Sequence, residues 1–156
     1  MTISWSADLG SGDRYQRRID AGGTVAHPLR DLMVGKRSLV TIVDDDESVR
    51  ESLPDLLRQC GFAAEAFSSA EAFLASDVVG ETSCLLLDIA MPGMSGPDLQ
   101  QELTDRRQQI PIVFITASGD RTVRPHLIAR GAVDCLFKPF SEAALLDAVN
   151  AALRMR

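Results

Sequence analysis

The sequence has few of the residues on which metal centres and nucleophilic catalysis usually depend. Among its 156 residues are only 2 His and 3 Cys. Cys60, Cys84 and Cys135 lie in or beside apolar runs without zinc-site spacing, which predicts buried free thiols in a reducing compartment. His27 and His126 are isolated, so structural or solvent roles are favoured over metal binding. The motifs G-x-x-x-x-G-K-[ST] and G-x-S-x-G are both absent, which excludes the P-loop and nucleophile-elbow classes.

Long apolar runs are also missing. None reaches the roughly 18 residues that a membrane-spanning helix needs, and the N-terminus has no apolar signal-peptide core. We therefore expect a soluble, cytoplasmic protein without a membrane partner. The net charge of −6 argues against nucleic acid as a partner, and we expect no direct DNA binding. An apolar fraction of 46% and this chain length fit one globular domain.

The first 37 residues differ from the rest. They contain six Lys or Arg and four Asp or Glu, so this segment is basic within an acidic chain. Gly, Ser and charged residues alternate there without a period of 2 or 3.6 residues. We expect a flexible extension over residues 1–37, with Met33 as a candidate translation start, and a folded domain over residues 38–156.

After residue 38, apolar strands and amphipathic helices alternate. Strands are predicted at 39–43, 62–67, 84–88, 110–116 and 132–137. Helices are predicted from Val49 to Cys60 with Gly61 as the stop, after Ser68 or Ser69, from Pro97, over 120–130 with the weakest pattern, and after Ser141. Five strand–helix units with continuous apolar strands predict an α/β fold. Right-handed crossovers favour a doubly wound, five-stranded parallel sheet of order 2-1-3-4-5.

Polar side chains follow the strands at the edge where such sheets bind ligands. Asp44 and Asp45 follow the first strand, Asp88 ends the third, Thr116 ends the fourth and Lys138 follows the fifth. Clustered carboxylates repel each other, which raises their pKa values unless a cation offsets the charge. Oxygen ligands without His or Cys suit Mg²⁺. An acidic cluster with Mg²⁺, a hydroxyl and an ammonium is suited to handling a phosphoryl group.

Five stretches carry a family resemblance. They are "IVDDDESVRESL", "FSSAEAFL", "LLLDIAMPGMSG", "IPIVFITA" and "GAVDCLFKPF". In this order they resemble a response-regulator receiver domain with the CheY fold, most similar to receivers that are usually joined to a LuxR-type helix-turn-helix. The resemblance covers roughly residues 38–154. Asp88 lies 44 positions after Asp44 and 50 before Lys138, intervals similar to those of the family.

The resemblance implies roles for the acidic residues. Asp88 would be the phospho-acceptor, and Asp44, Asp45 and Asp88 would hold Mg²⁺ together with the backbone carbonyl of Ala90. The phosphoryl donor would be a sensor histidine kinase or a histidine phosphotransfer protein. Transfer to Asp88 would be in line, with the protein mainly positioning the reacting groups.

Further roles follow from the same resemblance. Thr116 and Lys138 would bind the phosphoryl oxygens, and the Lys138–Pro139 peptide bond is expected to be cis. Asp46 falls just after the metal pair, where it is expected to cap the helix or lie in its first turn. Movement of the Thr116 hydroxyl would shift the loop after the fourth strand and the face formed by the fourth helix, the fifth strand and the fifth helix.

Three features depart from the family pattern. Cys135 stands where an aromatic residue is usual; Phe137, on the same strand face, either supplies the aromatic surface or leaves a muted switch. Pro125 predicts that its helix begins late or is kinked, because proline disfavours helix at Arg124, and leaves family-style homodimerisation open. Ala90 and Ser118 occupy positions that tune dephosphorylation in the family, and neither residue type predicts a lifetime.

The leading hypothesis is a stand-alone response regulator, a signalling phospho-acceptor rather than an enzyme, which acts on a downstream protein target. One alternative is an interaction scaffold with the receiver fold that is not phosphorylated. Another is a Mg²⁺-dependent phosphohydrolase with an aspartyl-phosphate intermediate. Ala90 disfavours the hydrolase, because that chemistry normally needs a second acid at this position.

Overall fold

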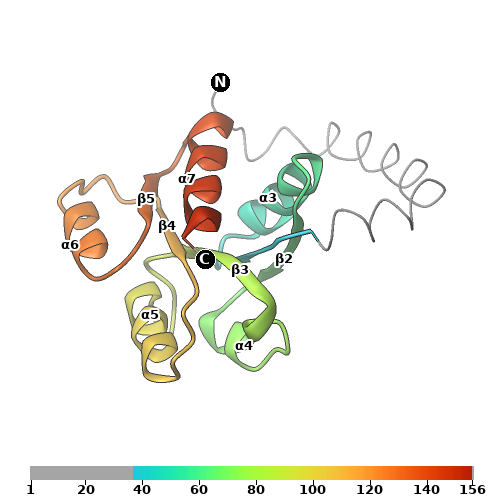
Figure 1. Ribbon diagram of the computed structural model, residues 1–156. Helices are drawn as coiled ribbons and strands as arrows, with labels where there is room; N and C mark the ends of the chain where they lie inside the picture. Colours follow the sequence, from blue (N-terminus) through green and yellow to red (C-terminus); the bar gives the residue numbers. More distant parts are fainter. Residues whose placement is uncertain (1–36, 156) are drawn as a thin grey trace.

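The computed structural model describes residues 37–155 (Figure 1). The predicted flexible extension, apart from Arg37, and the candidate start at Met33 lie outside the described residues. Among the described residues no helix is both long enough and apolar enough to cross a lipid bilayer.

Five parallel strands form one sheet. They are β1 (Leu39–Val43), β2 (Ala63–Phe67), β3 (Thr82–Asp88), β4 (Ile112–Thr116) and β5 (Asp134–Phe137). Their order is β2-β1-β3-β4-β5, which confirms the predicted doubly wound α/β topology. The first strand has the predicted bounds, whereas β3 begins two residues earlier than predicted and β4 and β5 begin two residues later.

Within residues 37–155, four α-helices and one 3₁₀ turn lie between successive strands, and a fifth α-helix follows β5. They are α3 (Glu47–Gln59), α4 (Ala70–Leu74), α5 (Gly96–Asp105), α6 (Val123–Ala129) and α7 (Glu142–Arg154), with the turn η1 (Val79–Glu81). Side chains of Asp46, Ser69, Ser95 and Ser141 cap four of the helices by accepting backbone N–H groups. Gly61, at φ +96°, follows the end of α3 as predicted. Helix α5 begins at Gly96, one residue before the predicted start at Pro97.

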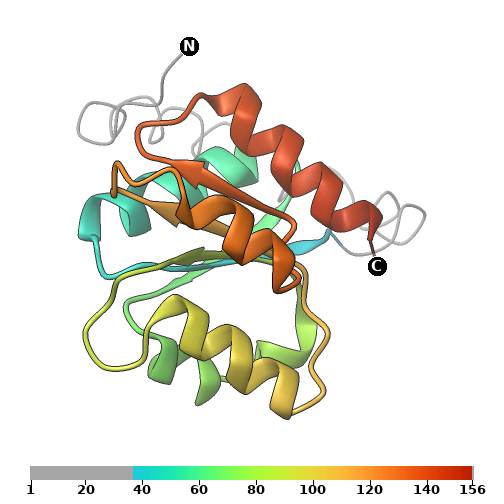
Figure 2. The same cartoon turned by 90° about the vertical axis from the view of Figure 1, so that its left-hand side faces the viewer.

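The helices cover both faces of the sheet (Figure 2). Leu53 of α3 and Leu145 of α7 pack in one apolar cluster with Leu86 of β3. Leu99 of α5 packs in the second cluster, on the opposite face, together with Phe73 of α4. Side chains that alternate along a strand point to opposite faces, so each strand contributes to both clusters. The central strand is therefore buried on both sides, as its continuous apolar run predicted.

The two prolines within helices have different settings. Pro125 is the third residue of α6, in the first turn, where the missing N–H would have no helical partner. The helix begins late, at Val123, as one of the two alternatives predicted. Arg124 is helical, contrary to the expectation from the residue-before-proline rule, because the proline falls so close to the helix start. Pro54 lies inside α3 beside the fully buried Leu53 and stays helical.

The three cysteines are free thiols, as predicted. Cys84 and Cys135 are buried, whereas Cys60 at the end of α3 is only half-buried, so the prediction of three buried thiols is wrong for Cys60. Burial raises the pKa of the Cys84 thiol to about 12, which keeps it protonated.

Candidate functional site

Strand register brings two of the predicted acids together. Val43 of β1 pairs with Leu87 of β3, so Asp44, which follows β1, lies beside Asp88, the last residue of β3. Carboxylate oxygens of Asp44, Asp45 and Asp88 all lie within 4.8 Å of one another. The predicted acidic cluster at the carboxyl edge of the sheet is therefore present.

The acidic cluster combines buried and exposed carboxylates. Asp44 is fully buried and Asp88 is 7% exposed, whereas Asp45 is exposed. Burial and the nearby negative charge of Asp44 raise the pKa of Asp88 to about 7, and Lys138 opposes this rise. Three oxygen donors this close, one of them resisting ionisation, form a donor set that fits a hard divalent cation such as Mg²⁺.

Lys138 reaches the cluster from the position directly after β5. Its Nζ donates to Asp44 Oδ2 at 2.8 Å, and the side chains are 11% and 0% exposed. The Lys138 backbone N–H donates to the Thr116 carbonyl at 2.8 Å, which ties the ends of β4 and β5. The Lys138–Pro139 bond is cis, as predicted. The ammonium thus offsets part of the charge of the acidic cluster, through Asp44.

The start of α3 holds the Asp44 segment in place. Asp46 is the predicted helix cap: its carboxylate accepts from the Ser48 N–H at 2.9 Å and from Ser48 Oγ at 2.8 Å. These bonds lower the pKa of Asp46. Arg50, which the sequence reasoning missed, donates from Nη1 to the Asp44 carbonyl at 3.0 Å. Its place one turn into α3 was the available signal, but the direction of its side chain depends on the loop.

Thr116 lies at the end of the adjacent strand and is buried. Its Oγ1 accepts from the Ser118 N–H at 3.1 Å, so the hydroxyl is engaged with its own loop. Thr116 pairs in register with Phe137, and Phe114 pairs with Cys135, so these side chains share one face of the sheet. Phe137 is the register partner of Thr116, on the predicted face, whereas Cys135 is buried in the apolar cluster. That Phe137 supplies the aromatic surface of the switch stays one of two predicted alternatives.

Arg121 is a second residue that sequence reasoning missed. Its guanidinium lies over the Phe137 ring, 4.3 Å from the centroid, which is a cation–π geometry. Phe137 is therefore covered by a side chain from the loop that follows Thr116. Ser118 and Asp120 organise the same loop, since the Asp120 N–H donates to Ser118 Oγ at 3.1 Å.

The loop after Asp88 carries the remaining predicted site residue. Ala90 is exposed there, two positions after Asp88, and its carbonyl stays a predicted ligand. The Gly96 N–H donates to the Ile89 carbonyl at 2.9 Å and closes the loop. A Cβ atom at Gly96 would overlap the Asp88 carbonyl oxygen, so this close approach requires glycine.

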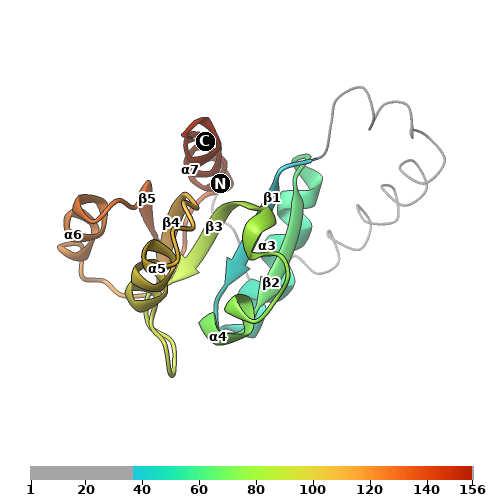
Figure 3. The ribbon, with the colours of Figure 1, turned by 60° about the horizontal axis from the view of Figure 1, so that its bottom comes forward.

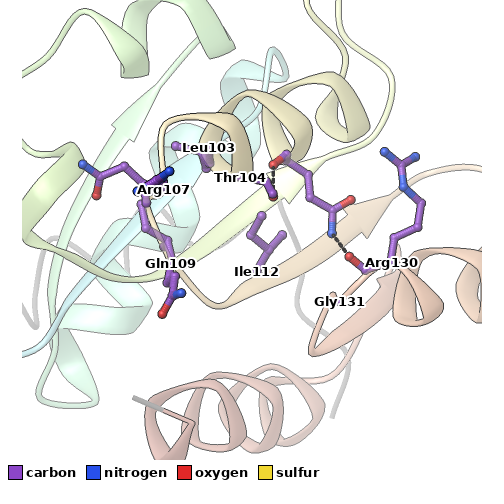
Figure 4. A pocket seen from close by; sticks show the side chains of 10 residues that line it. Leu103, Thr104, Arg107, Gln109, Ile112, Arg130 and Gly131 are labelled. Atoms are coloured by element: carbon purple, nitrogen blue, oxygen red, sulfur yellow. Dashed lines mark hydrogen bonds between the residues drawn. The ribbon is translucent and has the colours of Figure 1, made fainter.

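A separate cavity of about 330 Å³ lies at the other end of the strands (Figure 4). It is lined by the C-terminal part of α5, by Arg130 and Gly131 before β5, and by Ile112 at the start of β4. Because Ile112 begins the strand that ends at Thr116, this cavity is at the opposite edge from Asp88. None of the predicted site residues lines it.

Comparison with known proteins identifies the fold family. The model of the response regulator receiver domain family matches residues 40–150. The response regulator protein TodT of Pseudomonas putida is 44% identical over 123 residues, which are 79% of this chain and 54% of TodT. Nodulation protein W of Bradyrhizobium diazoefficiens is 47% identical over 116 residues, which are 74% of this chain and 51% of that protein. The chain thus spans about half the length of these curated relatives.

Solved structures agree with the sequence matches. The response regulator StyR superposes with a TM-score of 0.71 at 48% identity, covering 76% of this chain and 60% of StyR. The structure of FixJ-N superposes with a TM-score of 0.70 at 37% identity, covering 78% of this chain and 98% of FixJ-N. The resemblance to receivers of LuxR- and FixJ-type regulators is therefore confirmed for the receiver part.

The acidic triad has a clear meaning in this family. It is typical of the Mg²⁺ site of receiver domains. A receiver domain is a signalling phospho-acceptor rather than a catalytic enzyme, and it implies interaction with a histidine kinase. The family match, the fold and the acidic cluster agree, and the chain belongs to the family of response regulator receiver domains.

Proposed function

We propose that this chain accepts a phosphoryl group on Asp88, from a histidine kinase or a histidine phosphotransfer protein, and signals to a protein target by a conformational change. The observation that supports this most is the placement of Asp88. It ends the central strand, within 4.8 Å of the Asp44 and Asp45 carboxylates, while Lys138 lies 2.8 Å from Asp44. Stand-alone action, proposed from the sequence, stays a prediction.

Asp88 acts as the nucleophile in this proposal. One carboxylate oxygen attacks the phosphorus of the donor's phospho-imidazole, the P–O bond forms as the P–N bond breaks, and the released imidazole nitrogen takes a proton from water. The attack needs the ionised carboxylate, whose pKa of about 7 in the metal-free site limits that form at neutral pH. Asp44, Asp45, Asp88 and the Ala90 carbonyl would hold Mg²⁺, whose positive charge would favour the ionised form.

Lys138 and Thr116 then rearrange toward the new phosphoryl group. The Lys138 ammonium leaves Asp44 Oδ2 for a phosphoryl oxygen, since both partners are anionic and the exchange keeps the ion paired. The Thr116 hydroxyl donates to another oxygen and loses the bond that it now accepts from the Ser118 N–H. The loop of residues 117–122 begins with that bond, so its loss carries the change toward α6.

The direct test is labelling with acetyl phosphate, measured by intact mass. Wild type gains one phosphoryl group with Mg²⁺ and none without it, while Asp88→Asn gains none. Asp147→Asn, which changes an exposed carboxylate on α7, is labelled like wild type and controls for loss of charge. Wild type that neither binds Mg²⁺ in calorimetry nor gains mass from acetyl phosphate contradicts the proposal and favours an interaction scaffold that is not phosphorylated.

A further inference from the structure

The loop between β3 and α5, residues 89–95, is fixed at three points. The Ile89 carbonyl accepts from the Gly96 N–H at 2.9 Å, next to the sheet. The Met91 side chain is 8% exposed and packs in the apolar cluster that contains Phe73 of α4. The Met94 N–H donates to Glu71 Oε2 at 3.0 Å. The contacts of Ile89 and Met91 lie on either side of Ala90, and the contact of Met94 holds the end of the loop nearer to α5.

Glu71 reaches this loop from a helix that is itself well anchored. It is the second residue of α4, which begins at the Ser69 cap and buries Phe73 completely. The Phe73 ring meets the Phe67 ring edge-on, with centroids 5.8 Å apart. The Glu71 carboxylate therefore extends from a fixed base to the Met94 amide, 23 positions further along the chain.

The approach of the loop to Glu71 is close. Gly93 has φ +77°, and a Cβ atom built there would lie 2.6 Å from Glu71 Oε2. The carboxylate thus occupies the space that any larger residue at 93 would need. Its side chain is otherwise exposed, so the bond to Met94 adds little to global stability, and its main effect is on the position of the loop.

We propose that Glu71 is a positioning residue for the metal site: it holds the 89–95 loop so that the Ala90 carbonyl can serve as a ligand of a cation beside Asp88. This inference rests on the proposed function, because it takes the Ala90 carbonyl as a ligand. Residues behind the direct ligands orient them and change metal affinity without touching the ion. Glu71 acts in this way through the loop backbone.

The first measurement needs no metal. In ¹⁵N-labelled protein, Glu71→Ala exposes the Met94 amide, and its hydrogen exchange becomes about tenfold faster, as expected for loss of a charge-assisted bond. Glu71→Gln keeps an acceptor oxygen of nearly the same reach, so exchange at Met94 changes by about twofold or less. An unchanged Met94 amide in Glu71→Ala overturns the proposed contact.

The second measurement is Mg²⁺ affinity by calorimetry. Glu71→Ala raises the Kd about fivefold, whereas Glu71→Gln stays within about twofold of wild type. Glu51→Ala removes an exposed carboxylate from α3 and controls for long-range charge. At saturating Mg²⁺ the labelling rate of Glu71→Ala by acetyl phosphate returns to the wild-type rate, because only the metal affinity has changed. Equal weakening in the Ala and Gln variants would attribute the effect to charge and overturn the inference.

A double-mutant cycle keeps the test specific to the loop. Gly93→Ala pushes against Glu71 and weakens Mg²⁺ binding, and it does so less in the Glu71→Ala background, where the opposing carboxylate is gone. Additive effects contradict the proposed link. If wild type binds Mg²⁺ and is labelled, and Glu71→Ala has the same Mg²⁺ affinity and labelling rate, only the proposed role of Glu71 is refuted. Failure of wild type in both assays refutes the proposed function as well.

Discussion

Helices α6 and α7 both pack against β5, on opposite faces of the sheet, yet they are built very differently (Figure 3). Helix α7 has 13 residues and packs across β3, β4 and β5. Its buried residues are Leu145, Ala148, Val149 and Ala152. Helix α6 has 7 residues, buries only Leu127 and packs mainly on β5. One helix is therefore part of the fixed core and the other is attached at few points.

This difference in burial between α6 and α7 indicates which element a change at Asp88 would move most easily. Thr116 leads directly into the loop that precedes α6, and that loop is held by short-range bonds such as Ser118 N–H to Thr116 Oγ1. A segment with few buried apolar contacts opens at a lower free energy than the core does. A change of bonding at Thr116 would therefore act first on α6, while β3, on which α7 packs, holds Asp88 in place.

The largest expected effect is a difference in the free energy of unfolding between alanine variants of α7 and α6. Leu145→Ala in α7 lowers the free energy of unfolding by about 3 kcal/mol, because the side chain is fully buried between helix and sheet. Leu127→Ala in α6 costs only about 1–2 kcal/mol, since the loss is limited by the free energy that docks this short helix. Urea denaturation of both variants measures the difference.

Hydrogen exchange gives the control for that comparison. In Leu127→Ala the amides of α6 exchange faster while those of β3 and α7 keep wild-type protection. If Leu127→Ala costs as much as Leu145→Ala, and lowers protection everywhere, α6 is part of the cooperative core and the contrast fails.

The second largest expected effect concerns the electrostatic cost of burying the Asp88 carboxylate beside Asp44. In the folded, metal-free protein the pKa of Asp88 is raised to about 7 by burial and by Asp44, above its value in the unfolded chain. The folded state thus binds more protons between these two values, and stability falls as pH rises through about 7. Asp88→Asn removes that fall.

Asp88→Asn therefore leaves stability nearly unchanged near pH 4 and raises it by about 1–2 kcal/mol at pH 8, after allowance for solvent screening at the open sheet edge. Denaturant midpoints from pH 4 to 8, without Mg²⁺, measure this. Added Mg²⁺ stabilises wild type at pH 8 more than Asp88→Asn, because the mutant has lost one carboxylate ligand. A pH-independent difference between the two proteins would contradict the electrostatic explanation.

Periodicity and capping were sufficient to predict the fold. Continuous apolar runs located all five strands, and Ser141 marked the start of α7. The carboxyl ends of those strands then predicted that Asp44, Asp45 and Asp88 meet, without any knowledge of side-chain positions. The roles of these residues in metal binding and phosphoryl transfer remain predictions that depend on family resemblance.

The sequence did not predict the contacts that exposed charged residues make. Arg50, Glu71 and Arg121 each bond to a loop or ring whose position follows from tertiary structure, and none lies in a periodic pattern. The extra 3₁₀ turn at Val79–Glu81 was missed for a similar reason, since short turns leave a weak sequence signal. The residues that tune the site were thus less predictable than the residues that form it.

The smallest expected effect tests how α6 is held near Thr116. Arg121 lies over the ring of Phe137, and an exposed cation–π contact contributes about 0.5 kcal/mol. Arg121→Ala is therefore expected to speed amide exchange in α6 about twofold, with no measurable change in the denaturation midpoint. Arg106→Ala removes a similarly exposed arginine, paired with Glu102 on α5, and serves as the matched control.

Amide exchange in α6 can also be compared between the phosphorylated and unphosphorylated forms of wild type and Arg121→Ala. If Phe137 replaces the usual aromatic at position 135, movement of Thr116 changes the environment of its register partner, Phe137, and releases Arg121 from the ring. The α6 amides of phosphorylated wild type then exchange as fast as those of unphosphorylated Arg121→Ala, and phosphorylation adds nothing further in that variant. Additive effects would instead show that the signal leaves Thr116 by another path, and would favour the muted switch predicted from Cys135.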